Sequence, residues 1–157
     1  MADGGDEVEI GAHGPFPVTE GEWKGWQAWV GGDPFEDNSG PFYFRKEDDG
    51  TMRCAFRAEK KHMNGGGFMH GGCLMTFADY ALFCIATDDL GDGGSVTASL
   101  NGEFIGSAGV GDLIEASGEV IRAGGSLVFI RGLVSTGGRP LLNFSAIIKK
   151  TRRRPAA

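Results

Sequence analysis

Asp79 has the clearest capacity for chemistry, because it is a carboxylate inside the most apolar segment of the chain. Its neighbours Phe77, Ala78, Tyr80 and Ala81 are aromatic or aliphatic. An ionised carboxylate in such surroundings is costly unless it is paired, so it acquires a partner, a raised pKa or a catalytic role. The competing interpretation is a carboxylate that emerges at the surface of a helix, since many perturbed carboxylates are structural.

A second feature lies upstream of Asp79, where glycines at positions 65–67 lead into His70-Gly71-Gly72. Glycine disfavours helix interiors, so a glycine pair in a first helical turn indicates that backbone amides are approached closely. Free N–H groups at a helix N-terminus attract negative charge, and they could polarise a carbonyl and hold an oxyanion. The alternative interpretation is that residues 65–72 are only a glycine-rich loop before an ordinary helix. The presence of Asp79 further along the same helix makes this interpretation less favoured.

Hydrophobic periodicity predicts the elements that must position these residues. Residues 69–86 have apolar side chains at three- and four-residue intervals, which predicts one long central helix. Residues 42–46 and 52–58 predict a hairpin before it, and residues 95–105, 112–122, 127–135 and 141–150 predict a four-strand meander after it. The pattern indicates an α+β domain, and the helix is so apolar that the sheet must wrap around it. A curved antiparallel sheet around one long central helix is the hotdog fold.

The flanking segments complete the expected organisation. We expect residues 1–14 to be a disordered acidic tail and residues 15–40 to hold a helix and a loop. The helix is placed at 19–30, where Trp23, Trp26 and Trp29 have helical spacing. Residues 41–150 form the hotdog domain, and residues 151–157 form a basic tail.

Composition limits the partners. The chain has 157 residues and a net charge of −6, which argues against nucleic acid as the main partner. The three cysteines are set among apolar neighbours without paired spacing, which indicates reduced thiols. The N-terminus lacks a signal-peptide pattern, and no apolar run reaches the roughly 20 residues of a membrane span. We therefore expect a cytoplasmic protein without a membrane partner.

The string from Asn64 to Gly72, with Asp79 nine residues after His70 (79 − 70 = 9), resembles the PaaI-like hotdog thioesterases. The similarity continues through residues 96–101, Phe104 and residues 111–112, and in organisation it covers roughly residues 42–150. It implies an acyl-CoA thioesterase that works without a cofactor or metal.

The resemblance also implies roles for matching positions. Asp79 would be the general base that activates water, or a nucleophile, and the Gly71 amide would polarise the thioester carbonyl. His70 would lie near the carbonyl or sulfur, and Asn64 would hydrogen-bond near the reacting group. Thr97 would position water, although a strand threonine fits that position equally well.

The CoA part of the substrate has weaker signals. Gly72 and the turn that contains Arg122, Gly124 and Gly125 are the expected substrate-binding residues. Other cations could hold the phosphates, although each also fits a solvated surface: Arg57, Lys60, Lys61, Lys149 and Lys150. The sequence does not identify the acyl group of the substrate. Bulky residues on the helix and in the tryptophan-rich segment favour a medium or aromatic acyl chain.

Spacing adds a constraint that the motif does not contain. Gly71 and Asp79 are eight residues apart (79 − 71 = 8), which separates them by roughly 12 Å along a helix. A base and an oxyanion donor must both lie within a few ångströms of one carbonyl carbon. We therefore expect a homodimer in which Asp79 of one chain faces His70-Gly71 of the other. Assembly of such dimers into a homotetramer is a separate expectation that the spacing does not address.

Other chemistries remain open at this point. Cys73 and His70 lie three residues apart and could form a nucleophile pair, although a packed thiol is favoured. His62 is expected on a loop or the surface, and the histidines lack zinc-ligand spacing with the cysteines. A hotdog hydratase or dehydratase and a non-catalytic acyl-CoA-binding protein are the alternative functions.

Overall fold

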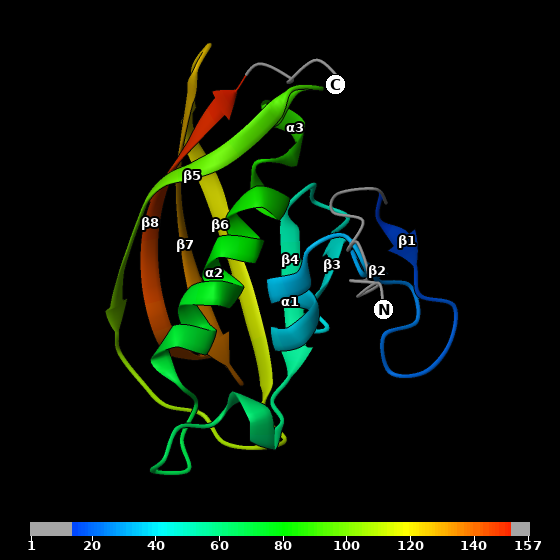
Figure 1. The fold of residues 1–157 in the computed structure, drawn as a ribbon, viewed down its shortest axis with the longest axis vertical. Helices are drawn as coiled ribbons and strands as arrows, with labels where there is room; N and C mark the ends of the chain where they lie inside the picture. Colours follow the sequence, from blue (N-terminus) through cyan, green and yellow to red (C-terminus); the bar gives the residue numbers. More distant parts are fainter. Residues whose placement is uncertain (1–13, 152–157) are drawn as a thin grey trace, which may run out of the picture.

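One long helix, α2 (Gly71–Ile85), lies against the inner face of a curved antiparallel sheet of eight strands (Figure 1). The computed structural model describes residues 14–151. The predicted central helix is confirmed to within two residues at its start and one at its end. A second short helix, α3 (Thr87–Leu90), follows it, and a 3₁₀ turn (Lys60–His62) precedes it.

The sheet has the strand order β1-β2-β3-β4-β6-β7-β8-β5. All six predicted strands are present, and the described part adds two strands of two residues each. The bounds are β1 (Phe16–Pro17), β2 (Gln27–Ala28), β3 (Tyr43–Lys46), β4 (Met52–Arg57), β5 (Gly94–Phe104), β6 (Leu113–Ala123), β7 (Leu127–Thr136) and β8 (Arg139–Thr151).

The predicted meander is wrong in one respect. β6, β7 and β8 are consecutive neighbours, but β5 pairs with β8 at the far edge, and β4 takes the place beside β6. This order puts β4 and β5 on opposite sides of α2, as Figure 1 shows. The sheet can therefore enclose the helix, which a simple meander leading away from it would not do.

The predicted helix at 19–30 is also wrong. Most of this segment consists of turns, and it ends in the short strand β2. Trp23 stacks on Tyr43 with ring centroids 4.3 Å apart, so the aromatic residues pack against the sheet edge instead of forming a helical stripe. The helix of this region is α1 (Pro34–Ser39), which lies within the predicted loop.

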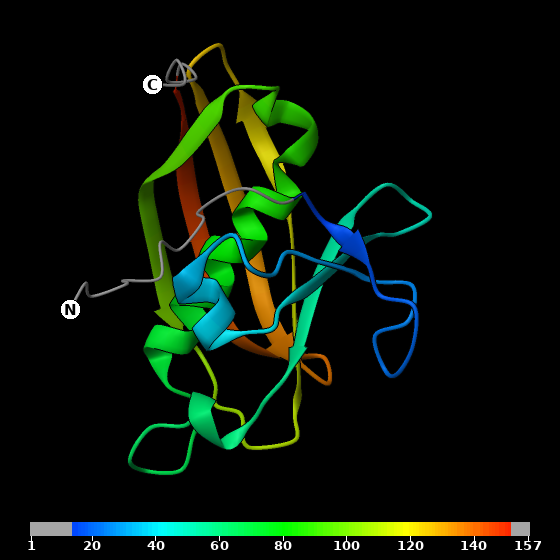
Figure 2. The same cartoon turned by 45° about the vertical axis from the view of Figure 1, so that its right-hand side comes forward.

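Local chemistry explains why α1 forms where it does. Asp33 is its N-cap and accepts hydrogen bonds from the amides of Phe35 and Glu36, at 3.1 and 3.0 Å. Pro34 occupies the first helical position, where its missing N–H costs nothing. α1 packs on α2, so that α2 lies between α1 and β5 (Figures 1 and 2). None of the helices in residues 14–151 is long and apolar enough to cross a membrane.

Two glycines opposite each other on β6 and β7 allow the core to pack closely. Gly118 pairs with Gly132 in the ladder. A Cβ added to Gly132 would lie 2.3 Å from Cζ of the buried Phe144, and one added to Gly118 would lie 3.0 Å from Cδ1 of Ile85. The absence of these two Cβ atoms makes room for a core ring and for the end of α2.

We predict that Gly132→Ala destabilises the protein by about 2 kcal/mol, because the new methyl group overpacks a site that cannot yield. The free energy of unfolding from urea titration measures the change. Gly109→Ala is the matched control, since a Cβ there meets nothing within 4 Å. An equal loss in both variants would contradict the packing explanation.

Candidate functional site

Asp79 lies half-buried on α2, where the sheet edge supplies a partner. Its Oδ1 accepts a hydrogen bond of 2.7 Å from the hydroxyl of Thr97 on β5. The structure thus brings together two of the predicted site residues that are 18 positions apart in the sequence. The hydrogen bond holds the Asp79 carboxylate in a fixed orientation against β5.

The start of α2 has one backbone donor without an acceptor in the described residues, 14–151. His70 is the N-cap, and its Nδ1 accepts a hydrogen bond of 2.8 Å from the Gly72 amide. The Gly71 amide has no acceptor among the residues that the structure describes. A Cβ on Gly72 would lie 3.0 Å from Nδ1 of His70, so glycine there keeps the cap geometry open. A free amide at a helix N-terminus suits a developing oxyanion.

Asn64 shapes the loop that leads into α2. Its Oδ1 accepts hydrogen bonds from the amides of Gly66, at 2.9 Å, and Phe68, at 3.2 Å. The side-chain carbonyl is therefore committed within the loop, and only the NH₂ group remains for a ligand. Within one chain, Asn64 is near the start of α2 and acts as an organiser of the glycine loop.

The expected CoA-binding turn is not beside the start of α2 in the same chain. Arg122 is exposed near the end of β6, and Gly124 and Gly125 are exposed in the turn that joins β6 to β7. In Figure 1 this turn lies near the C-terminal end of α2, at the opposite end of the molecule from Gly72. Arg122 also lines a cavity on the outer face of the sheet, away from the helix.

Some alternative cations already have partners. Arg57 pairs with Glu22 and donates to the carbonyl of Gly111, at 3.0 Å. Lys61 donates to the carbonyls of Asn38 and Gly40 at the end of α1. Both side chains fasten one segment to another, so phosphate binding would compete with an existing contact.

The expectation of a surface position for His62 is wrong, because its side chain is buried. Its Nδ1 accepts from the Glu59 amide at 2.9 Å, and its Nε2 lies 2.7 Å from the carbonyl oxygen of Ser39. Burial lowers the pKa of His62, which favours the neutral ring that makes both contacts. His62 therefore links the end of α1 to the loop before α2.

Cys73 is not prepared for nucleophilic chemistry. Burial raises the pKa of its thiol to about 11, so the reactive thiolate is scarce at neutral pH. Cys54 and Cys84 are fully buried and unpaired, as the sequence predicts for reduced thiols. The pairing of Cys73 with His70 as a catalytic unit is therefore disfavoured.

Sequence reasoning missed Glu36, a carboxyl group on α1. Burial, followed by repulsion from nearby carboxylates, raises its pKa to about 7. Those carboxylates belong to Asp33, Asp79 and Asp37. The signal that could have located α1 is the string Asp33-Pro34, an N-cap followed by proline at the first helical position.

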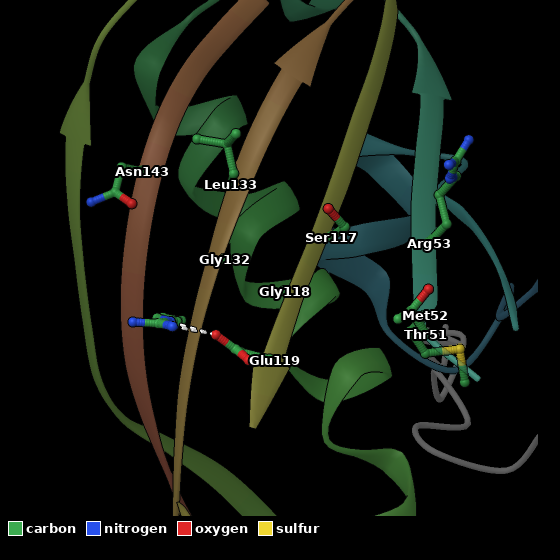
Figure 3. A pocket seen from close by; sticks show the side chains of 10 residues that line it. Thr51, Met52, Arg53, Ser117, Gly118, Glu119, Gly132, Leu133 and Asn143 are labelled. Carbon is green, nitrogen blue, oxygen red and sulfur yellow. Dashed lines mark hydrogen bonds and ion pairs between the residues drawn. The ribbon is translucent and has the colours of Figure 1, made fainter. Parts of the chain in front are cut away.

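Two cavities differ in whether expected site residues line them. A cavity of about 620 Å³ lies on the outer face of the sheet, where Arg131 pairs with Glu119 (Figure 3). It contains none of the expected site residues. A cavity of about 400 Å³ lies between α1 and the start of α2, and its lining includes Lys61, His70, Gly72 and Thr76. The second cavity is therefore the one that lies next to the His70-Gly71-Gly72 start of α2.

Comparisons with known proteins indicate the family of this chain. A family described as the thioesterase superfamily matches residues 66–142. A protein of Pseudomonas aeruginosa described as a proposed esterase (PA0474) is 32% identical over 125 residues, which cover 79% of this chain and 93% of the relative.

Solved structures share the fold at lower identity. The PaaI protein of the E. coli phenylacetic acid degradation operon has a TM-score of 0.65 and 18% identity, covering 76% of this chain and 85% of its own. A hypothetical thioesterase of Streptococcus pneumoniae, solved with coenzyme A, has a TM-score of 0.62 and 19% identity, covering 73% and 88%. The predicted hotdog fold and PaaI-like resemblance are confirmed.

We predict that Glu36 makes stability fall as pH rises. Its pKa is about 7 in the folded protein and near the ordinary 4.5 when exposed, so the native state holds its proton more tightly. The resulting stabilisation is present below the unfolded pKa and is lost as pH rises through the folded pKa. Between about pH 5 and pH 7 we expect a loss of about 1 kcal/mol, after reduction for solvent screening.

Urea titrations at a series of pH values measure this loss. Glu36→Gln should remove it, whereas Glu20→Gln, at an exposed position of the N-terminal segment, should retain it. An unchanged pH dependence in Glu36→Gln would contradict the assignment.

Proposed function

Because this chain belongs to the thioesterase superfamily and is a thioester hydrolase, we propose that it hydrolyses acyl-CoA to a carboxylic acid and free CoA. Two features of α2 carry the proposal. Asp79 accepts a hydrogen bond from Thr97, and the first amide of the helix, at Gly71, has no acceptor within residues 14–151. The structure of the Streptococcus pneumoniae thioesterase with coenzyme A supports CoA as the thiol.

The proposed reaction uses few protein groups. Asp79 takes a proton from water, and the water oxygen attacks the thioester carbonyl carbon. The Gly71 amide stabilises the oxyanion, and the C–S bond then breaks to release the CoA thiolate, which takes up a proton. Nucleophilic attack by Asp79 itself, through an anhydride, is the alternative sequence. Thr97 keeps Asp79 oriented, and His70 fixes the amide end of the helix.

Helix geometry requires two chains for this chemistry. Gly71 and Asp79 are separated by roughly 12 Å along α2, which is too far for both to reach one carbonyl. β5 is an edge strand of 11 residues, and an edge of this length invites pairing with a second copy. Two antiparallel copies joined at β5 would put Asp79 of one chain near Gly71 of the other.

The same arrangement gives the expected CoA-binding turn a use. In an antiparallel dimer, the turn that carries Arg122 and Gly124 would lie at the end of the molecule where the partner's α2 begins. These residues would then contact a substrate held by the partner, with Asn64 contributing its NH₂ group. Assembly of such dimers into a homotetramer and a cytoplasmic location complete the proposal.

We predict that Asp79→Asn lowers kcat for acyl-CoA hydrolysis by about 10³-fold, the range for loss of a general base. Thr97→Val should lower kcat by about tenfold, because it removes only the orientation of the carboxylate. Release of free thiol from hexanoyl-CoA is the measurement. Full activity in Asp79→Asn would reject this residue, and an enoyl or hydroxyacyl product would favour the hydratase.

Mixed dimers test whether the site is shared. Asp79→Asn and Gly71→Val should each be inactive alone, since one removes the base and the other obstructs the amide. After co-expression, about half of the dimers are mixed, and each mixed dimer with shared sites has one intact site of two. This arrangement predicts recovery of about a quarter of wild-type activity. If each site lay within one chain, no combination would be intact and no activity would return.

A further inference from the structure

An apolar cavity of about 410 Å³ lies between the N-terminal segment and α2. Aromatic rings of Trp29, Tyr43 and Tyr80 form part of its wall, and Val30 lies at its edge with 45% of its surface exposed. Its volume is within the range of small-molecule sites. The cavity is separate from the one at the start of α2, which has different lining residues.

The cavity is linked to Asp79 through Glu36. Tyr80, which follows Asp79 on α2, lines the cavity, and Asp79 is one of the carboxylates that raise the pKa of Glu36 on the cavity wall. Most of the wall comes from residues 16–43, outside the segment 66–142 that matches the superfamily. The N-terminal segment therefore adds to the shared fold an apolar space on the α1 side of α2, within electrostatic reach of Asp79.

Glu36 gives this apolar space a polar feature. Its side chain lines the cavity, and the part of the chain described by the structure offers its carboxyl group no hydrogen-bonding or ion-pair partner. Asp37 also lines the cavity, but its carboxylate is occupied by the Gly31 amide, at 2.9 and 3.0 Å. A half-buried carboxyl without a partner is unfavourable for folding and is thus a candidate for a ligand-related role.

We propose that this cavity binds the acyl chain of the substrate and that Glu36 makes the site select uncharged acyl chains over chains that end in a carboxylate. The proposal rests on the thioesterase function proposed above. Aromatic walls favour an apolar chain by excluding water from it. A terminal carboxylate would lose its hydration there and would also meet acidic side chains of the same sign.

A matched pair of ligands isolates the effect of the charge. The non-hydrolysable thioethers hexyl-CoA and 5-carboxypentyl-CoA differ at the end of the chain and can be titrated calorimetrically against the full-length protein. At about pH 8.5, above the Glu36 pKa of about 7, we expect wild type to bind hexyl-CoA at least tenfold more tightly, since like charges in a desolvated site are costly. Glu36→Gln should reduce this ratio about tenfold, and Glu36→Lys should reduce it further.

Glu20→Gln is the control, because it removes a carboxylate of the N-terminal segment that does not line the cavity. An unchanged ratio in both Glu36 variants would overturn the role of Glu36. A ratio that changes equally in Glu20→Gln would also overturn it, since a general loss of negative charge would then be the cause.

Filling the cavity tests whether the chain binds there. Val30→Trp adds an indole at the exposed edge and should lower the affinity for hexyl-CoA relative to methyl-CoA about tenfold. Lys24→Trp adds the same indole at an exposed position outside the cavity and should keep that relative affinity. No effect of Val30→Trp on a folded protein would overturn the location.

These binding ratios are independent of turnover, so the two proposals can fail separately. If Asp79→Asn remains active while the ratios change as expected, the catalytic assignment fails and the acyl-binding cavity stands. If Asp79→Asn is inactive but the ratios do not respond to Glu36 or Val30, the acyl-binding assignment fails and the catalytic one stands.

Discussion

Close packing of α2 into the concave face of the sheet is the constraint on which the rest of the structure depends. The helix buries Leu74, Phe77 and Leu82 completely or nearly so, and the sheet accommodates its end because Gly118 has no side chain. A helix held in this way is rigid. The free amide at its start and the carboxylate of Asp79 are therefore fixed about two turns apart. The same packing that positions the two groups also keeps them from acting together within one chain.

Much of this arrangement could be predicted from the sequence, because periodicity reports which face of an element is buried. That information located α2 and the six main strands, and it identified Asp79 as the sole charged residue of the helix. Periodicity does not report which strands are neighbours. β5 alternates as a middle strand would, and its place beside β8 follows from the need to cover the far side of α2.

The errors at the N-terminal segment have a physical reason as well. Trp23, Trp26 and Trp29 have a three-residue spacing that suits a helix. In the structure, however, Trp23 and Trp29 stack on rings of β3, and Trp26 packs edge-on against Trp23. Large aromatic surfaces gain more from such contacts than from local helix formation, which is marginal for short segments. At the site, the cap formed by His70 and the partnership of Asp79 with Thr97 agree with the motif. The Arg122 turn lies far from the start of α2 in the same chain, so its use in the site rests on the proposed dimer, which one sequence does not display.

Two carboxyl groups with different surroundings lie along the path proposed for the acyl chain. Thr97 donates a hydrogen bond to Asp79, whereas Glu36 lines an apolar cavity and its carboxyl group has no hydrogen-bonding partner among residues 14–151. Burial and nearby carboxylates raise the pKa of Glu36 to about 7, so Glu36 is fully charged only above that pH. In the functions proposed above, Asp79 takes the proton of water and Glu36 disfavours a charged acyl chain, and the different surroundings of the two carboxyl groups suit these two roles.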